Sequence, residues 1–249
     1  NDMERERPNM NQTVSVDLRS DADLVRALDA AVQRHAMLKH PFYQAWSEGA
    51  LSLDDLREYS KQYFHHVKAF PRYVSAVHAN CDDLPLRQEL LKNLCEEEQG
   101  ENNHPELWLR FAEGMGVDRT DVEHAEPTYA TQASVEIFRD LTRNGSYLQG
   151  MAALYAYESQ IPDVAKTKRE GLNEFYGLNS PEAVSFFSVH EVADVFHRQV
   201  ECDALVSHAK SVEERELVVH AAERASQALW QFLDGMQQLR GPNAASCAC

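Results

Sequence analysis

Three imidazoles and three carboxylates of this chain stand at spacings that would turn each cluster toward one side of a helix. They are Glu97 and His104, Glu158 in LYAYESQIP, and His190, Asp194 and His197 in SVHEVADVFH. Positions seven apart on a helix lie within about 20° of each other, and the last three span about 60°. Helical bundles hold two oxygen-reactive transition metals with such nitrogen and oxygen donors, pointed inward from separate helices. The pattern predicts a dinuclear metal oxidase.

The competing interpretation is that these spacings arise by chance among 11 histidines and 40 acidic residues. Most pairs of this kind in proteins are solvated or cap a helix. The last cluster has apolar surroundings, since it interleaves with Val189, Val192, Val195 and Phe196 and no lysine or arginine follows until Arg198. An unpaired carboxylate there would be costly, and a bound metal removes that cost. The surroundings therefore favour metal ligands.

Length and charge limit the class of protein. A chain of 249 residues that is 43% hydrophobic can bury the core of one large helical domain. The formal net charge of −16, without a basic stripe, argues against nucleic acid or an anionic membrane as partner. Five cysteines form neither a CxxC pair nor a disulfide framework, so we expect free thiols.

Targeting signals are missing from the sequence. Apolar runs fall short of the roughly 18 to 20 residues of a membrane helix. The opening NDMERERPNMNQ lacks the apolar centre of a signal peptide. We therefore expect a cytoplasmic protein, and a homodimer, which is the commonest oligomer of soluble proteins.

The apolar residues recur with a period near 3.6 along most of the chain, which indicates an all-α protein. We expect flexible ends at residues 1–16 and 241–249, and one domain over 17–240. The helical segments fall at about residues 21–35, 53–81, 86–103, 127–143, 146–160, 180–209 and 213–239, with a short one at 40–48 and a restart of the 86–103 helix at 105–113. The 86–103 helix is expected to carry both Glu97 and His104. These segments predict a compact bundle of seven to eight helices that carries the metal ligands on three of them.

Several further residues have ordinary explanations when taken alone. Tyr43 in HPFYQAW would be a core aromatic residue, and Lys168 in AKTKRE a solvated cation. His65 and His66 are expected to pack or to form supporting hydrogen bonds. The acidic neighbours of Glu97, among them Glu96, are expected on a solvated face.

The chain resembles the haem-oxygenase-like diiron oxidases. This family is related in fold to pyrroloquinoline quinone synthase and to thiaminase-like proteins, and the resemblance covers roughly residues 20–238. Within it, the chain is most similar to the group around the chlamydial death-domain-associating protein. That group arranges its six ligands as Glu-x6-His, a lone Glu, and His-x3-Asp-x2-His, and all six match here. The resemblance therefore implies this fold and two metal ions, as iron with iron or manganese with iron.

The resemblance also implies an activity. Proteins of this group make p-aminobenzoate for folate biosynthesis in a single turnover by consuming their own side chains, with dioxygen and an external reductant as co-substrates. The tyrosine that supplies the ring matches Tyr43, and the lysine that supplies the amino nitrogen matches Lys168. One departure is Phe186, which stands where the family has an active-site tyrosine. A radical relay through that position would be absent, while Tyr157 remains available for one.

Three other functions stay open at the level of sequence. A multi-turnover oxygenase of the same fold would act on a free amino acid or fatty acid and would need an open cavity beside the metals. A helical interaction or signalling module would bind no metal. A thiaminase-like hydrolase would need a nucleophilic cysteine in the core, for which only Cys81, Cys95 and Cys202 could serve.

Overall fold

The computed structural model describes residues 18–240, and within them every regular element is a helix. The α-helices are α1 (Asp21–Arg34), α2 (Pro41–Ser47), α3 (Leu53–Asn80), α4 (Leu84–Glu98), α5 (His104–Gly114), α6 (Arg119–Glu123), α7 (Tyr129–Arg143), α8 (Tyr147–Glu158), α9 (Ile161–Phe175), α10 (Ser185–His208) and α11 (Val212–Leu239), with a 3-10 turn η1 at Met37–Lys39. The all-α prediction is confirmed. The flexible ends that we expected lie outside the described residues.

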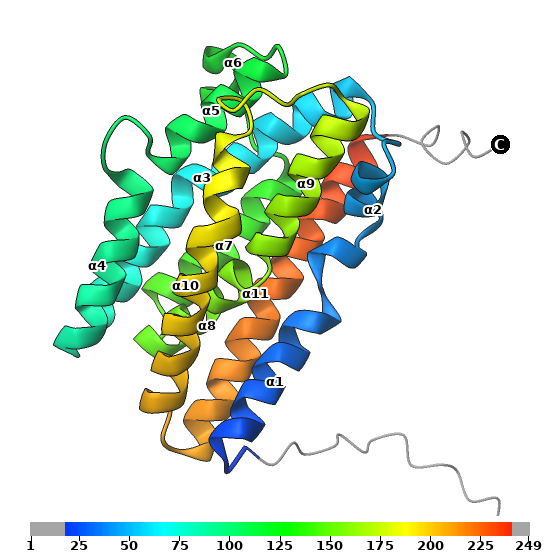
Figure 1. Cartoon of the computed structure of the whole chain (residues 1–249). Coiled ribbons are helices and arrows are strands. Elements are labelled where there is room, and N and C mark those ends of the chain that lie inside the picture. The colour runs from blue at the N-terminus through cyan, green and yellow to red at the C-terminus, as the bar shows by residue number, and fades with distance from the viewer. Residues whose placement is uncertain (1–17, 241–249) are drawn as a thin grey trace, which may run out of the picture.

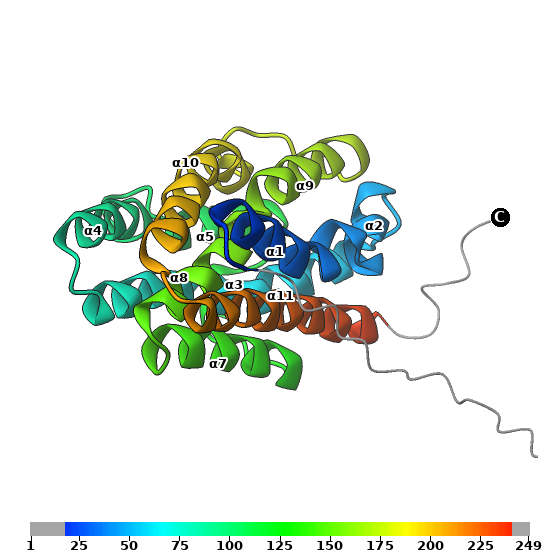
Figure 2. The same ribbon diagram turned by 90° about the horizontal axis from the view of Figure 1, so that it is seen from below.

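Helix α8 lies at the centre of the bundle. Every residue from Gly150 to Glu158 is buried, so this helix is apolar on all sides. It contacts α3, α7, α10 and α11, which run alongside it, and α9 begins just beyond its end (Figures 1 and 2). Figure 2 shows α11 between α1 and α7, with α9 and α10 on the opposite side of α1. Glu158 ends the central helix, so its carboxylate is delivered directly into the core.

Short polar motifs set the starts of the long helices. Ser52, Ser146 and Ser211 each cap a helix by accepting a backbone hydrogen bond with the side-chain oxygen. In each case, the side chain of the residue three positions later accepts a hydrogen bond from the backbone N–H of the capping serine. Such capping boxes satisfy backbone N–H groups that a helix start leaves unpaired. In the box of α3, the N–H of Asp55 donates to Ser52 Oγ, and the N–H of Ser52 donates to Asp55 Oδ2.

Glu97 and His104 do not share one helix, contrary to our expectation. Helix α4 ends at Glu98, and α5 begins at His104 after a cap by Asn103. Gly100 has φ +77°, a left-handed conformation that suits glycine and stops the helix. The six predicted ligands therefore come from four helices instead of three. The count of seven to eight helices was too low because α6 and α9 were not expected.

A second difference is helix α9, where we expected no helix. Its buried residues include Ile161, Val164, Ala165 and Leu172, which share one helical face, and a proline occupies its first turn. The interpretation of Lys168 as a solvated cation concealed this stripe, because Lys168 lies within the buried face. Helix α10 also starts later than expected, at Ser185, since the hydroxyl of Ser180 instead caps a turn at Ala183.

Within residues 18–240, no helix combines the length and the apolar character needed to cross a bilayer.

Helix α9 packs closely on α2 through Gly171. A Cβ atom at Gly171 would lie 2.8 Å from Cδ1 and 3.1 Å from the carbonyl oxygen of Trp46. The indole N–H of Trp46 donates to the carbonyl oxygen of Lys168 at 3.1 Å. This contact fixes the distance between the helix that carries Tyr43 and the helix that carries Lys168.

We expect Gly171→Val to lower the free energy of unfolding by about 1–3 kcal/mol, because the added side chain overpacks against Trp46. Asn173→Ala, at an exposed position of the same helix, should stay within about 0.5 kcal/mol of the wild type. Chemical denaturation measures both. Equal stabilities for the two variants would show that the α2–α9 contact is looser than described.

Candidate metal centre

The structure brings the six predicted ligands together in the core as two groups of three. One group consists of Glu97, His104 and His190, and the other of Glu158, Asp194 and His197. Within each group, the candidate donor atoms lie within 4.8 Å of one another. All six residues are buried, and none is more than 5% exposed. The arrangement could hold two metal ions side by side.

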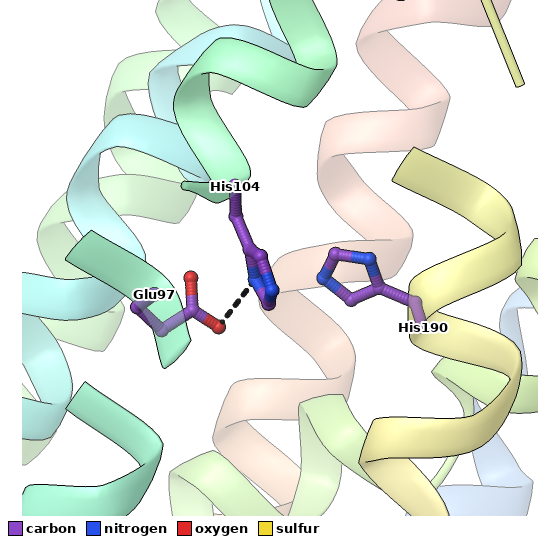
Figure 3. A group of neighbouring side chains, drawn as sticks. All are labelled: Glu97, His104 and His190. Carbon is purple, nitrogen blue, oxygen red and sulfur yellow. Dashed lines mark ion pairs between the residues drawn. The ribbon is translucent and has the colours of Figure 1, made fainter. Parts of the chain in front are cut away.

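The first group joins α4, α5 and α10. Figure 3 shows His104 between Glu97 and His190. His104 Nδ1 lies 2.9 Å from Glu97 Oε1, and the imidazole rings of His104 and His190 are 4.3 Å apart between centroids. His190 Nδ1 lies 2.6 Å from the carbonyl oxygen of Phe186. Because a carbonyl oxygen only accepts hydrogen bonds, Nδ1 of His190 carries the proton. Nε2 therefore keeps the lone pair that could bind a metal ion.

The second group joins α8 and α10. His197 Nδ1 lies 3.2 Å from Glu158 Oε1 and 3.6 Å from Asp194 Oδ1. On the other side of the ring, His197 Nε2 lies 3.1 Å from Oε2 of Glu96, a residue that we expected on a solvated face. A carboxylate behind a histidine typically fixes which ring nitrogen faces the metal. Here that nitrogen is Nδ1.

Unsatisfied polar atoms gather at this site. Among the described residues, the buried atoms without a hydrogen-bond partner include Asn93 Oδ1, Glu158 Oε2, Asp194 Oδ2 and both carboxylate oxygens of Glu201. Buried polar groups in native proteins are nearly always paired. A cluster of unpaired oxygen acceptors is the environment that metal ions complete, so the residues present fit a dinuclear centre.

Crowded carboxylates control the protonation of the site. Burial raises the pKa of Asp194 to about 7. Burial alone would lower the pKa of His197. The hydrogen bonds and negative charges of Asp194 and Glu158 have a larger effect and raise that pKa to about 11. Burial and the neighbouring Glu158 raise the pKa of Glu201 well above its ordinary value. Without a metal, the cluster therefore holds protons that a cation would displace.

Tyr43 and Lys168 meet in a second buried cluster. Lys168 Nζ donates to the hydroxyl of Tyr59 at 2.6 Å, and that hydroxyl lies 2.6 Å from the hydroxyl of Tyr43. Lys168 Nζ also lies 4.7 Å from the centroid of the Tyr43 ring. Burial lowers the pKa of Lys168 well below its ordinary value and raises that of Tyr43. Burial therefore favours the neutral amine of Lys168 and the protonated phenol of Tyr43.

Tyr157 connects this cluster to the candidate metal centre. It lines a central cavity of about 10 Å³ together with Glu97, His104, Glu158, His190 and Asp194. Its hydroxyl is hydrogen-bonded to that of Tyr63, and the ring of Tyr63 stacks on Tyr59 at a centroid distance of 5.3 Å. Tyr59 and Tyr63 were missed in the sequence, although their spacing of four places them on one face of α3.

The remaining predicted positions lie as follows. Phe186 lines the central cavity, and its ring centroid is 4.1 Å from that of His190. His66 is a packing residue, as expected, because Nε2 pairs with the hydroxyl of Ser134 at 3.0 Å and burial lowers its pKa to about 3. The cysteines of the described chain, Cys81, Cys95 and Cys202, are free thiols. Burial raises the pKa of Cys81, which is the opposite of nucleophilic activation.

Comparisons with known proteins identify the family. Residues 57–230 match the family model described as iron-containing redox enzyme. The chain is 44% identical over 220 residues to the 4-aminobenzoate synthase of Nitrosomonas europaea, covering 85% of this chain and 89% of that one. It is 43% identical over 222 residues to the 4-aminobenzoate synthase of Chlamydia muridarum, covering 89% and 92%.

Solved structures show the same fold. The structure of a TenA homologue from Pseudomonas syringae superposes with a TM-score of 0.75 at 17% identity, covering 87% of this chain and 92% of that one. The likeness of fold agrees with the family model and with the curated relatives. The chain therefore belongs to the haem-oxygenase-like family of iron-containing redox enzymes and is an oxidoreductase.

Proposed function

We propose that this protein makes p-aminobenzoate for folate biosynthesis in one dioxygen-dependent turnover, with the ring from Tyr43 and the amino nitrogen from Lys168. The observation that carries the proposal is the buried amine of Lys168, whose Nζ lies 4.7 Å from the centroid of the buried Tyr43 ring. The names of the curated relatives, 4-aminobenzoate synthases at 43–44% identity, support the same product.

Two metal ions would be held by the two groups of three ligands. Imidazole and carboxylate donors suit iron or manganese, so the pair would be iron with iron or manganese with iron. When bound, the pair would use dioxygen and electrons from an external reductant to supply the oxidising chemistry that an unactivated tyrosine requires. Tyr157, through its contact with Tyr63, would link that chemistry to the Tyr43 cluster.

The residues around Lys168 prepare it for a role as nitrogen donor. Because burial keeps the amine neutral, its lone pair is available. The hydroxyl of Tyr59 positions both partners, since it contacts Lys168 Nζ and the hydroxyl of Tyr43. A substrate that is part of the fold needs no binding step, and its effective molarity replaces affinity. The chain would be used up by one turnover.

The alternative is a multi-turnover oxygenase that acts on a free amino acid or fatty acid. Such a substrate needs an open cavity beside the metals, and pockets for small molecules usually measure about 300–1,000 Å³. The central cavity of about 10 Å³ has room for about one water molecule. This size favours a substrate that is built into the chain.

Metal analysis tests the ligand set. We expect the wild type to bind two ions per chain, and His104→Ala, Glu158→Ala and Asp194→Ala to lose at least one, because each removes a donor. His65→Ala and His124→Ala serve as controls that should leave the metal content unchanged. Wild-type metal content in all three ligand variants would refute the assignment.

Metal affinity should fall as the pH is lowered through 7. Below the raised pKa of about 7 Asp194 carries a proton, and below its pKa of about 11 His197 carries one, so a cation must displace both at pH 6. At pH 8 Asp194 is mostly ionised, and fewer protons leave. Calorimetry of Co²⁺ binding in buffers of different ionisation enthalpy measures this release. Equal release at pH 6 and pH 8 would contradict the proposed proton occupancy.

Self-consumption is tested with the reduced, metal-loaded protein and dioxygen. We expect at most one equivalent of p-aminobenzoate per chain without an added precursor. Ring-labelled tyrosine in the protein should label the product ring, and nitrogen-labelled lysine the amine. Tyr43→Phe and Lys168→Ala should bind metal normally and make no product.

Two matched variants control for general damage in that experiment. Tyr155→Phe alters a tyrosine of α8 whose hydroxyl bonds to Asp29, and Lys166→Ala alters an exposed lysine of α9. Both should retain full product. Repeated turnover with an added small molecule, or full product from Tyr43→Phe, would refute self-consumption and favour the conventional oxygenase.

A further inference from the structure

A cleft between α4 and α10 reaches the second group of candidate ligands from the surface. Its volume is about 40 Å³, and its walls include Leu90, Asn93, Glu96, Phe196, His197 and Glu201. Glu158 and Asp194 line the central cavity, whereas His197 lines the cleft. The second group therefore stands between the cleft and the centre of the bundle.

Glu201 is an unexplained buried acid at the inner end of this cleft. It lies one helical turn beyond His197, is 2% exposed and interacts with Glu158. Neither of its carboxylate oxygens has a hydrogen-bond partner within the described part of the chain. Burial beside the carboxylate of Glu158 makes Glu201 costly to ionise, and a bound cation would remove that cost.

Asn93 and Glu96 add oxygen atoms along the same cleft. Asn93 Oδ1 is buried without a partner, while its amide nitrogen donates to Glu158 Oε1 at 3.1 Å. Glu96 is half exposed, and its Oε2 lies 3.1 Å from His197 Nε2. Glu96 is thus exposed at the cleft, and Asn93 and Glu201 are buried in its lining. Glu158 lines the central cavity instead and is hydrogen-bonded to Asn93. Carboxylate and amide oxygens are ligands that divalent cations accept.

We propose that the cleft between α4 and α10 is the metal-loading route, in which Glu96 captures a divalent transition-metal ion and Glu201, with Asn93, holds it before it reaches Glu158. This inference rests on the dinuclear centre of the proposed function.

Charge favours this route over the larger groove between α3 and α7. That groove is lined by Arg72, Arg139 and Arg143, with Glu98 as its one acidic residue. Three guanidinium groups repel a cation, whereas the cleft between α4 and α10 carries three carboxylates and one lysine. Clefts lined by one sign of charge raise the local concentration of the opposite ion.

The test is the rate at which the metal-free full-length chain takes up Co²⁺, followed by stopped-flow visible absorption, with final stoichiometry from metal analysis. We expect Glu201→Gln and Glu96→Gln each to slow uptake about tenfold and still to reach two ions per chain. Lys92 lines the cleft and pairs with Glu89 at 2.6 Å. Lys92→Gln should speed uptake, since it removes the cation that opposes entry.

Glu98→Gln is the matched control, because Glu98 is an exposed acid of the same helix that faces the arginine-lined groove. It should load at the wild-type rate. Wild-type rates in both Glu201→Gln and Glu96→Gln would overturn the loading route and leave the dinuclear centre intact. Loss of one ion at equilibrium in Glu201→Gln would instead make Glu201 a permanent ligand, which also overturns it. A wild-type chain that binds no Co²⁺ would contradict the dinuclear centre itself.

Discussion

Burial of acidic groups in the middle of a helical bundle is the constraint on which the rest of this structure depends. Glu97, Glu158, Asp194 and Glu201 are each 3% exposed or less, and three imidazoles stand among them. Ionised carboxylates this deep are stable only with compensating charge, and no lysine or arginine side chain lines the central cavity. The four helices that carry these groups make sense as the frame of a cation site.

Lys168 is a buried base, and its burial is compensated in a different way from that of the acids. Within the described part of the chain, Lys168 forms no ion pair with a carboxylate, and its burial among the rings of Tyr43, Tyr59 and Tyr63 lowers its pKa. The two environments are joined by the hydroxyl contact between Tyr63 and Tyr157. The candidate metal centre and the buried amine of Lys168 are thereby connected through phenols.

Much of this could be predicted from the sequence, because helical periodicity and donor type are local properties. The all-α class and the convergence of Glu97, His104, Glu158 and the α10 cluster followed from spacing. The shared helix for Glu97 and His104 was wrong, since Gly100 breaks it. Helix α9 was missed because a buried lysine interrupts the expected apolar stripe. Glu96, Glu201, Tyr59 and Tyr63 could not be identified, since their roles depend on contacts between helices.

The most direct test of the account is anomalous X-ray diffraction from crystals of the metal-loaded protein. The account predicts two metal peaks per chain about 3.5–4 Å apart, the spacing of dinuclear enzyme sites. One peak should be bound by Glu97, His104 and His190 Nε2, and the other by Glu158, Asp194 and His197 Nδ1. A single peak, or metal bound away from these six side chains, would contradict the dinuclear centre.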